Sequence, residues 1–134
     1  MKNCLLVALL LAAGVLHAET AQQIEMAYAK QAAHEQMGYS PSAKRGSSFF
    51  RQPFAVSESM PSCTSCHTDN PLQPGRHAVT GKAIKPLAVA ANGERLSDPA
   101  KVEKWFGRNC RDVVGRACTA AEKADFVAFL SEVR

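Results

Sequence analysis

The chain has 134 residues, of which 46% are hydrophobic and 21% are charged, and its formal net charge is +4. A chain of this length has room for a single domain. So small a positive balance does not indicate binding to nucleic acid or to an anionic membrane surface.

The N-terminal segment has the three parts of a secretory signal peptide. Lys2 precedes an apolar run over residues 5–16, and the region that ends at Ala18 contains small residues. The run is too short to cross a membrane, which takes about 20 apolar residues. We predict a signal peptide over residues 1–18, export to the periplasm, and a mature domain over residues 19–134. Removing Lys2 lowers the net charge from +4 to +3.

Four cysteines remain after Cys4 leaves with the signal peptide: Cys63, Cys66, Cys110 and Cys118. In an oxidising compartment four cysteines indicate two disulfides, or one disulfide together with a cofactor attachment. Their number alone leaves both arrangements open.

Two helices are predicted in the N-terminal part of the mature chain. Residues 19–37 are rich in Ala, Gln, Glu and Lys, with Thr20 as a candidate N-cap. The Gly- and Pro-containing segment 38–41 ends this helix. A second, short helix is predicted over residues 42–50, where the small residue Gly46 allows another helix to approach closely.

Residues 51–97 are predicted to be mostly loop, because Pro and Gly interrupt them at short intervals. So long a loop is uncommon in a compact domain unless something other than secondary structure orders it. A buried cofactor would do so.

Two further helices are predicted after this loop. One spans residues 98–106, with Asp98 as its cap and Gly107 as its end. The last begins at the capping box of Thr119 and Glu122 and carries apolar residues at helical spacing. No alternating strand pattern of useful length occurs, so we predict an all-α fold of short helices and long ordered loops.

The segment with the most specific chemistry is Cys63-Thr-Ser-Cys66-His67. Two thiols at this spacing can add to the two vinyl groups of one porphyrin, and the adjacent imidazole can then bind the iron. We predict covalent attachment of one haem c through Cys63 and Cys66, with His67 as an iron ligand. A zinc site that also uses Cys110 and Cys118 is the weaker interpretation, because oxidised cysteines do not hold zinc. A thioredoxin-like redox pair lacks its α/β context here.

This motif does not fix the second axial ligand of the iron. Electron-transfer cytochromes commonly use a Met thioether, but every methionine of this chain precedes the motif. The remaining candidates are His77, Lys82, Lys85 and Asn109, or an open position. In chemical terms His77 is the best ligand among them.

Motifs spread over residues 61–130 resemble the sphaeroides haem protein family of class I cytochromes c. They occur in the same order and cover about half of the chain. The matching residues are Pro61-Ser-Cys-Thr-Ser-Cys-His67, Thr80-Gly-Lys82, Pro86-Leu-Ala88, Val102-Glu-Lys-Trp105, Gly107-Arg-Asn-Cys110, Gly115-Arg-Ala-Cys118-Thr119 and Glu122-Lys-Ala-Asp125.

The resemblance implies a class I cytochrome c fold around one covalently bound haem. It also implies Asn109 as the sixth ligand of the iron and a disulfide between Cys110 and Cys118 beside the haem. Redox partners implied in the same way are a dihaem cytochrome c and a membrane cytochrome b. Independently of the family, we expect Trp105 and Phe106 to pack against the haem.

An asparagine ligand predicts a redox-dependent function. An amide oxygen is a hard donor that ferrous iron binds poorly, so reduction should release Asn109 and open the iron to O2, NO or CO. We therefore expect an electron-transfer cytochrome whose ferrous form binds a diatomic gas. One alternative is a plain electron carrier in which His77 or Asn109 stays bound, and another is an enzyme that reduces oxygen or a nitrogen oxide, with His77 as its acid–base group. Basic residues of the C-terminal part are interpreted as solvated charges rather than a docking patch: Lys101, Lys104, Arg116 and Lys123.

Overall fold

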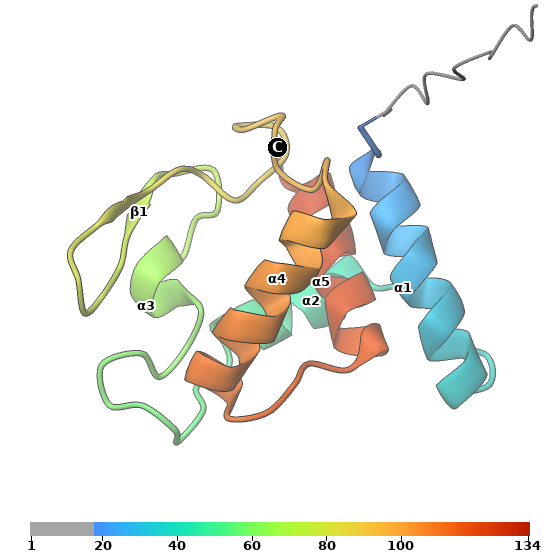
Figure 1. Ribbon diagram of the computed structural model, residues 1–134, viewed down its shortest axis with the longest axis horizontal. Coiled ribbons are helices and arrows are strands. Elements are labelled where there is room, and N and C mark those ends of the chain that lie inside the picture. Colours follow the sequence, from blue (N-terminus) through green and yellow to red (C-terminus); the bar gives the residue numbers. More distant parts are fainter. Residues whose placement is uncertain (1–17) are drawn as a thin grey trace, which may run out of the picture.

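The computed structural model describes residues 18–134. Apart from Ala18, the predicted signal peptide therefore lies outside the described residues. The elements follow in this order (Figure 1): α1 (Ala21–Glu35), α2 (Ala43–Arg51), α3 (Thr64–His67), β1 (Gly75–Arg76), β2 (Ala83–Ile84), α4 (Pro99–Asn109), the π-helix η1 (Cys110–Val114) and α5 (Ala120–Glu132). Within the described range, no helix has the length and apolar character needed to cross a membrane.

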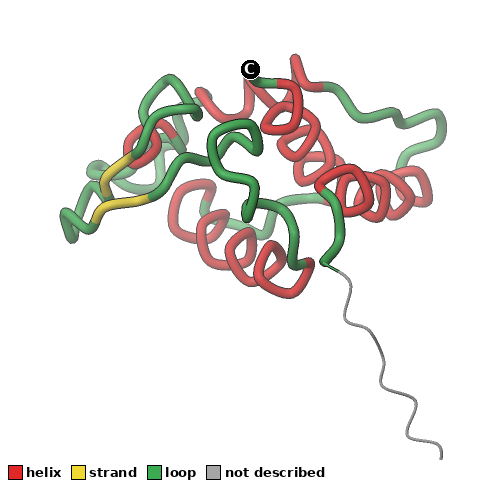
Figure 2. The backbone as a smooth tube through the Cα atoms, turned by 90° about the horizontal axis from the view of Figure 1, so that it is seen from above, coloured by secondary structure: helices red, strands yellow, loops and turns green. Residues whose placement is uncertain are grey.

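Each of the four longer helices begins where the sequence predicts it. Thr20 and Thr119 form capping boxes, in which the cap and the residue three positions later satisfy each other's backbone N–H groups. The side chains of Ser42 and Asp98 each accept a hydrogen bond from the N–H three residues later. The predicted all-α character and the long loop between α2 and α4 are also confirmed (Figure 2).

Helix α5 is the element on which the others pack. It contacts both α1 and α2, and Ile24 of α1, Val102 of α4 and Val127 of α5 form one buried cluster. Figure 1 shows α4 in front of α5, with α1 on one side and α3 with the β-ribbon on the other. The loop that carries the predicted haem motif is therefore separated from α1 by α4 and α5.

Helices α2 and α5 cross with almost no space between their backbones. Gly46 is buried at the crossing, and a Cβ atom there would collide with the carbonyl group of Asp125 and lie 2.9 Å from the Cβ of Phe129. Only glycine allows this approach, as the small residue in the sequence predicts.

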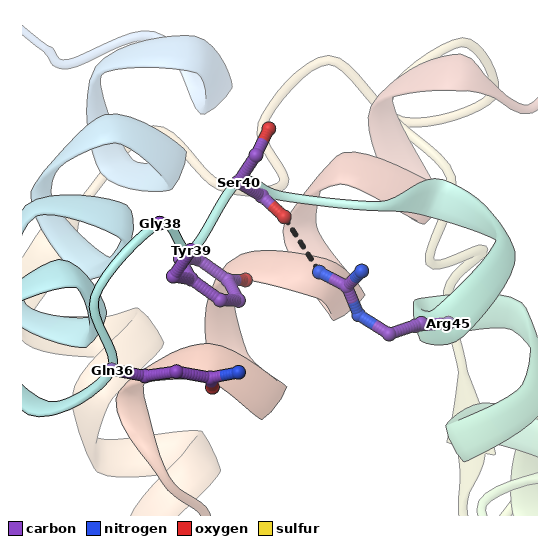
Figure 3. Close-up of a pocket in the computed structure, with 5 residues that line it drawn as sticks. All are labelled: Gln36, Gly38, Tyr39, Ser40 and Arg45. Carbon is purple, nitrogen blue, oxygen red and sulfur yellow. Dashed lines mark hydrogen bonds between the residues drawn. The ribbon is translucent and has the colours of Figure 1, made fainter.

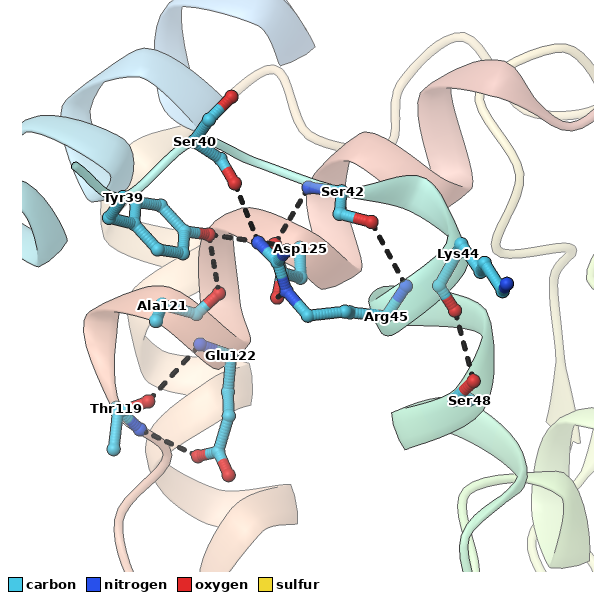
Figure 4. A network of polar contacts seen from close by, with 10 residues as sticks. All are labelled: Tyr39, Ser40, Ser42, Lys44, Arg45, Ser48, Thr119, Ala121, Glu122 and Asp125. Carbon is cyan, nitrogen blue, oxygen red and sulfur yellow. Dashed lines mark hydrogen bonds and ion pairs between the residues drawn. The ribbon is translucent and has the colours of Figure 1, made fainter.

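The carboxylate of Asp125 is buried at the same crossing, where the residue is 6% exposed. It accepts hydrogen bonds from three groups of the segment that enters α2 (Figure 4): the Tyr39 hydroxyl at 2.8 Å, the Ser42 N–H at 2.7 Å and the Arg45 guanidinium at 2.7 and 2.8 Å. A buried carboxylate is tolerated only when its oxygens are paired in this way. The network therefore fixes the start of α2 on α5.

Two details of the chain differ from the sequence prediction. Strands β1 and β2 form a two-residue antiparallel ribbon, which is too short to produce an alternating pattern. The prediction that Gly107 ends its helix is wrong, because α4 continues to Asn109 and then widens into η1. The turn comes instead at Gly115, whose φ of +79° is a left-handed conformation that favours glycine.

Replacing Gly46 with Ala should lower the free energy of unfolding by about 1–3 kcal/mol, because α2 and α5 must separate to admit the methyl group. Denaturant titration followed by far-UV circular dichroism measures this change. Gly93→Ala is the matched control, since a Cβ there meets nothing within 4 Å. Equal stabilities of the two variants would contradict the close crossing.

Candidate haem-binding site

The predicted attachment residues lie on a single helical turn. Cys63 immediately precedes α3, Cys66 and His67 lie within it, and the His67 N–H donates to the Cys63 carbonyl at 3.2 Å. Both thiols are free and partly buried. One turn therefore presents two free thiols together with an imidazole.

This turn is attached to the hydrophobic core through Cys63. Phe50, Phe129 and Leu130 form a buried cluster at the α2–α5 crossing, and Cys63 packs against it. Leu87, from the loop after α3, packs on the same cluster. The crossing of α2 and α5 thus positions the attachment residues.

Burial sets the protonation states of this turn. It raises the pKa of the Cys63 thiol to about 11, so the thiol is protonated at neutral pH. The pKa of His67 falls to about 4, mainly because of burial and further because of the positive charges of nearby Arg95 and His77. His67 is therefore neutral at pH 7, which is the form of imidazole that binds a metal ion.

His77 lies on the hairpin that packs against α3, on the same side as His67. The N–H of the next residue, Ala78, lies 3.2 Å from the Cys66 sulfur. The Nδ1 atom of His77 accepts the N–H groups two and three residues later, at 3.2 and 3.3 Å. A neutral ring that accepts at Nδ1 carries its proton on Nε2, so neither nitrogen offers a free lone pair to iron. The geometry therefore disfavours His77 as the sixth ligand.

Arg95 is a residue of this site that the sequence does not reveal. It is half-buried near His67, and its guanidinium donates to the carbonyl of Pro86 at 3.0 Å and to that of Lys85 at 2.9 Å. These bonds hold the loop after β2 beside the attachment turn. No spacing or motif distinguishes Arg95 from the other surface bases, so tertiary structure alone identifies it.

Asn109 is the last residue of α4, on a different element from His67. Its side chain is exposed and makes no hydrogen bond to any described residue. The amide oxygen is therefore available as a ligand, which neither nitrogen of His77 is.

The chain directly after Asn109 is tightly held. Cys110 and Cys118 are joined in a disulfide with a Cα–Cα distance of 5.7 Å, and both are buried. Between them runs η1, which ends with the Gly115 N–H donating to the Cys110 carbonyl at 3.0 Å. Single π-helical turns inside α-helices often occur at functional sites, and this one adjoins the predicted ligand.

The two aromatic residues predicted to pack against the haem lie in different environments. Phe106 belongs to the core, where its ring is 5.8 Å from that of Tyr28 and 5.6 Å from that of Phe126. Trp105 is 48% exposed, with the Arg108 guanidinium 5.8 Å from its ring centre. The contact between Trp105 and the cofactor stays a prediction.

The donor set fits a haem better than a zinc ion. Zinc would require Cys110 and Cys118 in addition to the thiols of α3, but the structure joins those two cysteines to each other. Among residues 18–134, no group of three or more His, Cys, Asp or Glu side chains converges on a metal position. Two free thiols beside a neutral imidazole match covalent haem attachment.

A polar hollow of about 330 Å³ lies away from these residues (Figure 3). It is lined by Gln36, Gly38, Tyr39, Ser40 and Arg45. The Arg45 guanidinium is already bonded to the Ser40 carbonyl at 2.6 Å and to Asp125. The hollow is therefore part of the structural network between α1 and α2 rather than of the haem site.

The fold and the attachment motif define a class I cytochrome c. The solved structure of oxidized SHP, an oxygen-binding cytochrome c, matches this chain with a TM-score of 0.77 and 39% identity, over 85% of this chain and 97% of that chain. The crystal structure of oxidized cytochrome c'' from Methylophilus methylotrophus matches with a TM-score of 0.78 and 37% identity, over 85% and 94%.

The chain belongs to the family described as a domain of unknown function, DUF1924, whose model matches residues 36–130. Cytochrome c'' of Methylophilus methylotrophus is 44% identical over 91 residues, and the cytochrome c-type protein SHP of Cereibacter sphaeroides is 52% identical over 71 residues. These matches cover 67% and 53% of this chain, and 63% and 54% of the relatives' own length. They confirm the resemblance to the sphaeroides haem protein family.

Replacing both Cys63 and Cys66 with Ala should abolish covalent haem attachment, whereas either single change leaves one thioether bond. Intact-mass measurement under denaturing conditions, with haem staining of a denaturing gel, distinguishes these cases. Ser65→Ala is the control, because it changes the same turn and keeps both thiols. A double variant that still carries covalent haem would contradict the assignment.

Proposed function

We propose that this protein is a periplasmic electron-transfer cytochrome with one covalently attached haem, whose sixth ligand Asn109 is released on reduction so that a diatomic gas can bind. The observation that carries the proposal is the placement of Asn109. It ends α4 with a free amide, directly before a π-helical turn and a disulfide-bonded cysteine.

The residues divide the binding of the cofactor between two elements. Cys63, Cys66 and His67 would hold the haem from the α3 side, and Asn109 would approach the iron from α4. A bound haem supplies an iron centre that exchanges one electron and, when its sixth position is open, binds a small gas molecule.

The ligand chemistry of Asn109 makes its release depend on redox state. Its amide carbonyl is a neutral, hard oxygen donor, which suits ferric iron and suits the softer ferrous iron poorly. The disulfide of Cys110 restrains the following segment, so the side chain of Asn109 can leave without unfolding of α4. Reduction thus opens the position and oxidation closes it.

The relatives support both parts of this proposal. SHP is described as an oxygen-binding cytochrome c. The solution structure of cytochrome c'' addresses haem-ligand detachment, and this chain matches it with a TM-score of 0.74 and 38% identity. The dihaem cytochrome c and the membrane cytochrome b implied by the family resemblance are our proposed redox partners.

The alternatives depend on His77. A plain carrier with a permanent histidine ligand needs a free lone pair on that ring, but the backbone N–H groups that bond to Nδ1 place the proton on Nε2. An oxygen- or nitrogen-oxide-reducing enzyme needs an acid–base group beside the open position, and His77 lies beside α3 instead. The geometry favours gas binding over both.

Variants at position 109 test the proposal. Asn109→Ala should convert the ferric protein to a five-coordinate high-spin spectrum, because the ligand is lost. Asn109→His should give a low-spin spectrum in both oxidation states and lower the apparent affinity of the ferrous protein for carbon monoxide at least about tenfold, because few sites remain open.

His77→Asn is the matched control for these variants, because an Asn oxygen can still accept the neighbouring N–H groups. Its ferric and ferrous spectra should equal those of the wild type. A low-spin ferric spectrum that survives Asn109→Ala and disappears in His77→Asn would overturn the assignment of the ligand.

A further inference from the structure

Four basic side chains lie on the solvent-facing side of α4 and the start of η1: Lys101, Lys104, Arg108 and Arg111. Their spacing of three, four and three residues places them on one helical face. All four are exposed, with side-chain exposures of 77% for Lys101 and 61% for Arg108. We refer to these four residues as the α4 stripe.

The stripe keeps an excess of positive charge. Lys101 lies 3.6 Å from Asp98, and Arg108 lies 3.8 Å from Asp112. Both pairs are exposed, and such pairs attract only weakly in water. Lys104 and Arg111 have no acidic partner within 4 Å among the described residues.

Other bases of the C-terminal part do not share this property. Lys123 is 14% exposed and donates to both carboxylate oxygens of Glu103, at 2.7 and 2.8 Å. Arg116 binds Glu122 in a two-pronged pair at 2.6 and 2.8 Å. These two bases serve the structure, whereas the α4 stripe has no structural task that explains its charge.

The stripe lies on the back of the helix that carries the proposed ligand. The opposite face of α4 packs into the core through Val102 and Phe106, and Asn109 ends the same helix. Arg108 lies over the ring of Trp105, so the stripe also touches the aromatic side chain expected beside the haem. One helix thickness, about 10 Å, separates the stripe from that side.

We propose that the α4 stripe is the docking surface for an acidic electron-transfer protein. This inference rests on the proposed function, because it supplies the route by which electrons reach the haem. A basic face steers an acidic partner into contact, raises the association rate and makes that rate depend on salt. The partner would then sit over the helix that ends in Asn109.

A gold electrode coated with a carboxylate-terminated monolayer serves as the acidic probe. The holoprotein should adsorb at low ionic strength and give a reversible voltammetric signal that salt removes. The double variant Lys104→Glu with Arg111→Glu should lose roughly tenfold or more of the adsorbed electroactive protein. Lys30→Glu with Lys44→Glu is the control, since it changes the net charge equally through exposed residues of α1 and α2.

Two results would overturn the docking surface. One is an equal loss for both double variants, which would show that only net charge matters. The other is binding to phosphatidylglycerol vesicles that depends on the stripe while the electrode signal does not, which would assign the stripe to lipid. Carbon monoxide spectra of the same samples test the release of Asn109 separately, so failure of the gas-binding proposal is recognised independently.

Discussion

The crossing of α2 and α5 at Gly46 is the constraint on which the rest of the structure depends. The helices meet so closely that the Asp125 carbonyl occupies the space of a side chain at position 46. The Asp125 carboxylate then joins the segment before α2 to α5. Because the aromatic cluster of Phe50 and Phe129 sits at the same place, a change in this crossing moves the surface on which Cys63 rests.

The proposed ligands approach from elements that pack on different sides of this core. His67 belongs to a short turn held by Cys63 and by the β1–β2 hairpin, whereas Asn109 ends a helix that packs on α5. The turn is covalently committed to the cofactor in the proposed function, and the neutral state of His67 suits permanent ligation. Asn109 is held through its backbone by the disulfide of Cys110, which leaves its side chain free to change partners.

Local sequence patterns predict much of this structure. The capping residues Thr20 and Thr119 mark helix starts correctly, because a cap depends only on residues three positions away. Gly107 misleads, because the disulfide and the π-helical turn carry the helix past it, and both depend on contacts distant in sequence. The role of Arg95 is invisible in the sequence for the same reason, while the assignment of Asn109 relies on the family resemblance and not on any pattern.

The most direct test of redox-dependent ligand release uses the wild-type holoprotein. Visible absorption spectra are recorded in the ferric state and after reduction with dithionite, before and after addition of carbon monoxide. Our account predicts a high-spin, five-coordinate ferrous spectrum that shifts when carbon monoxide binds. A low-spin ferrous spectrum that carbon monoxide does not change would contradict the release of Asn109 and would indicate simple electron transfer with a permanent sixth ligand.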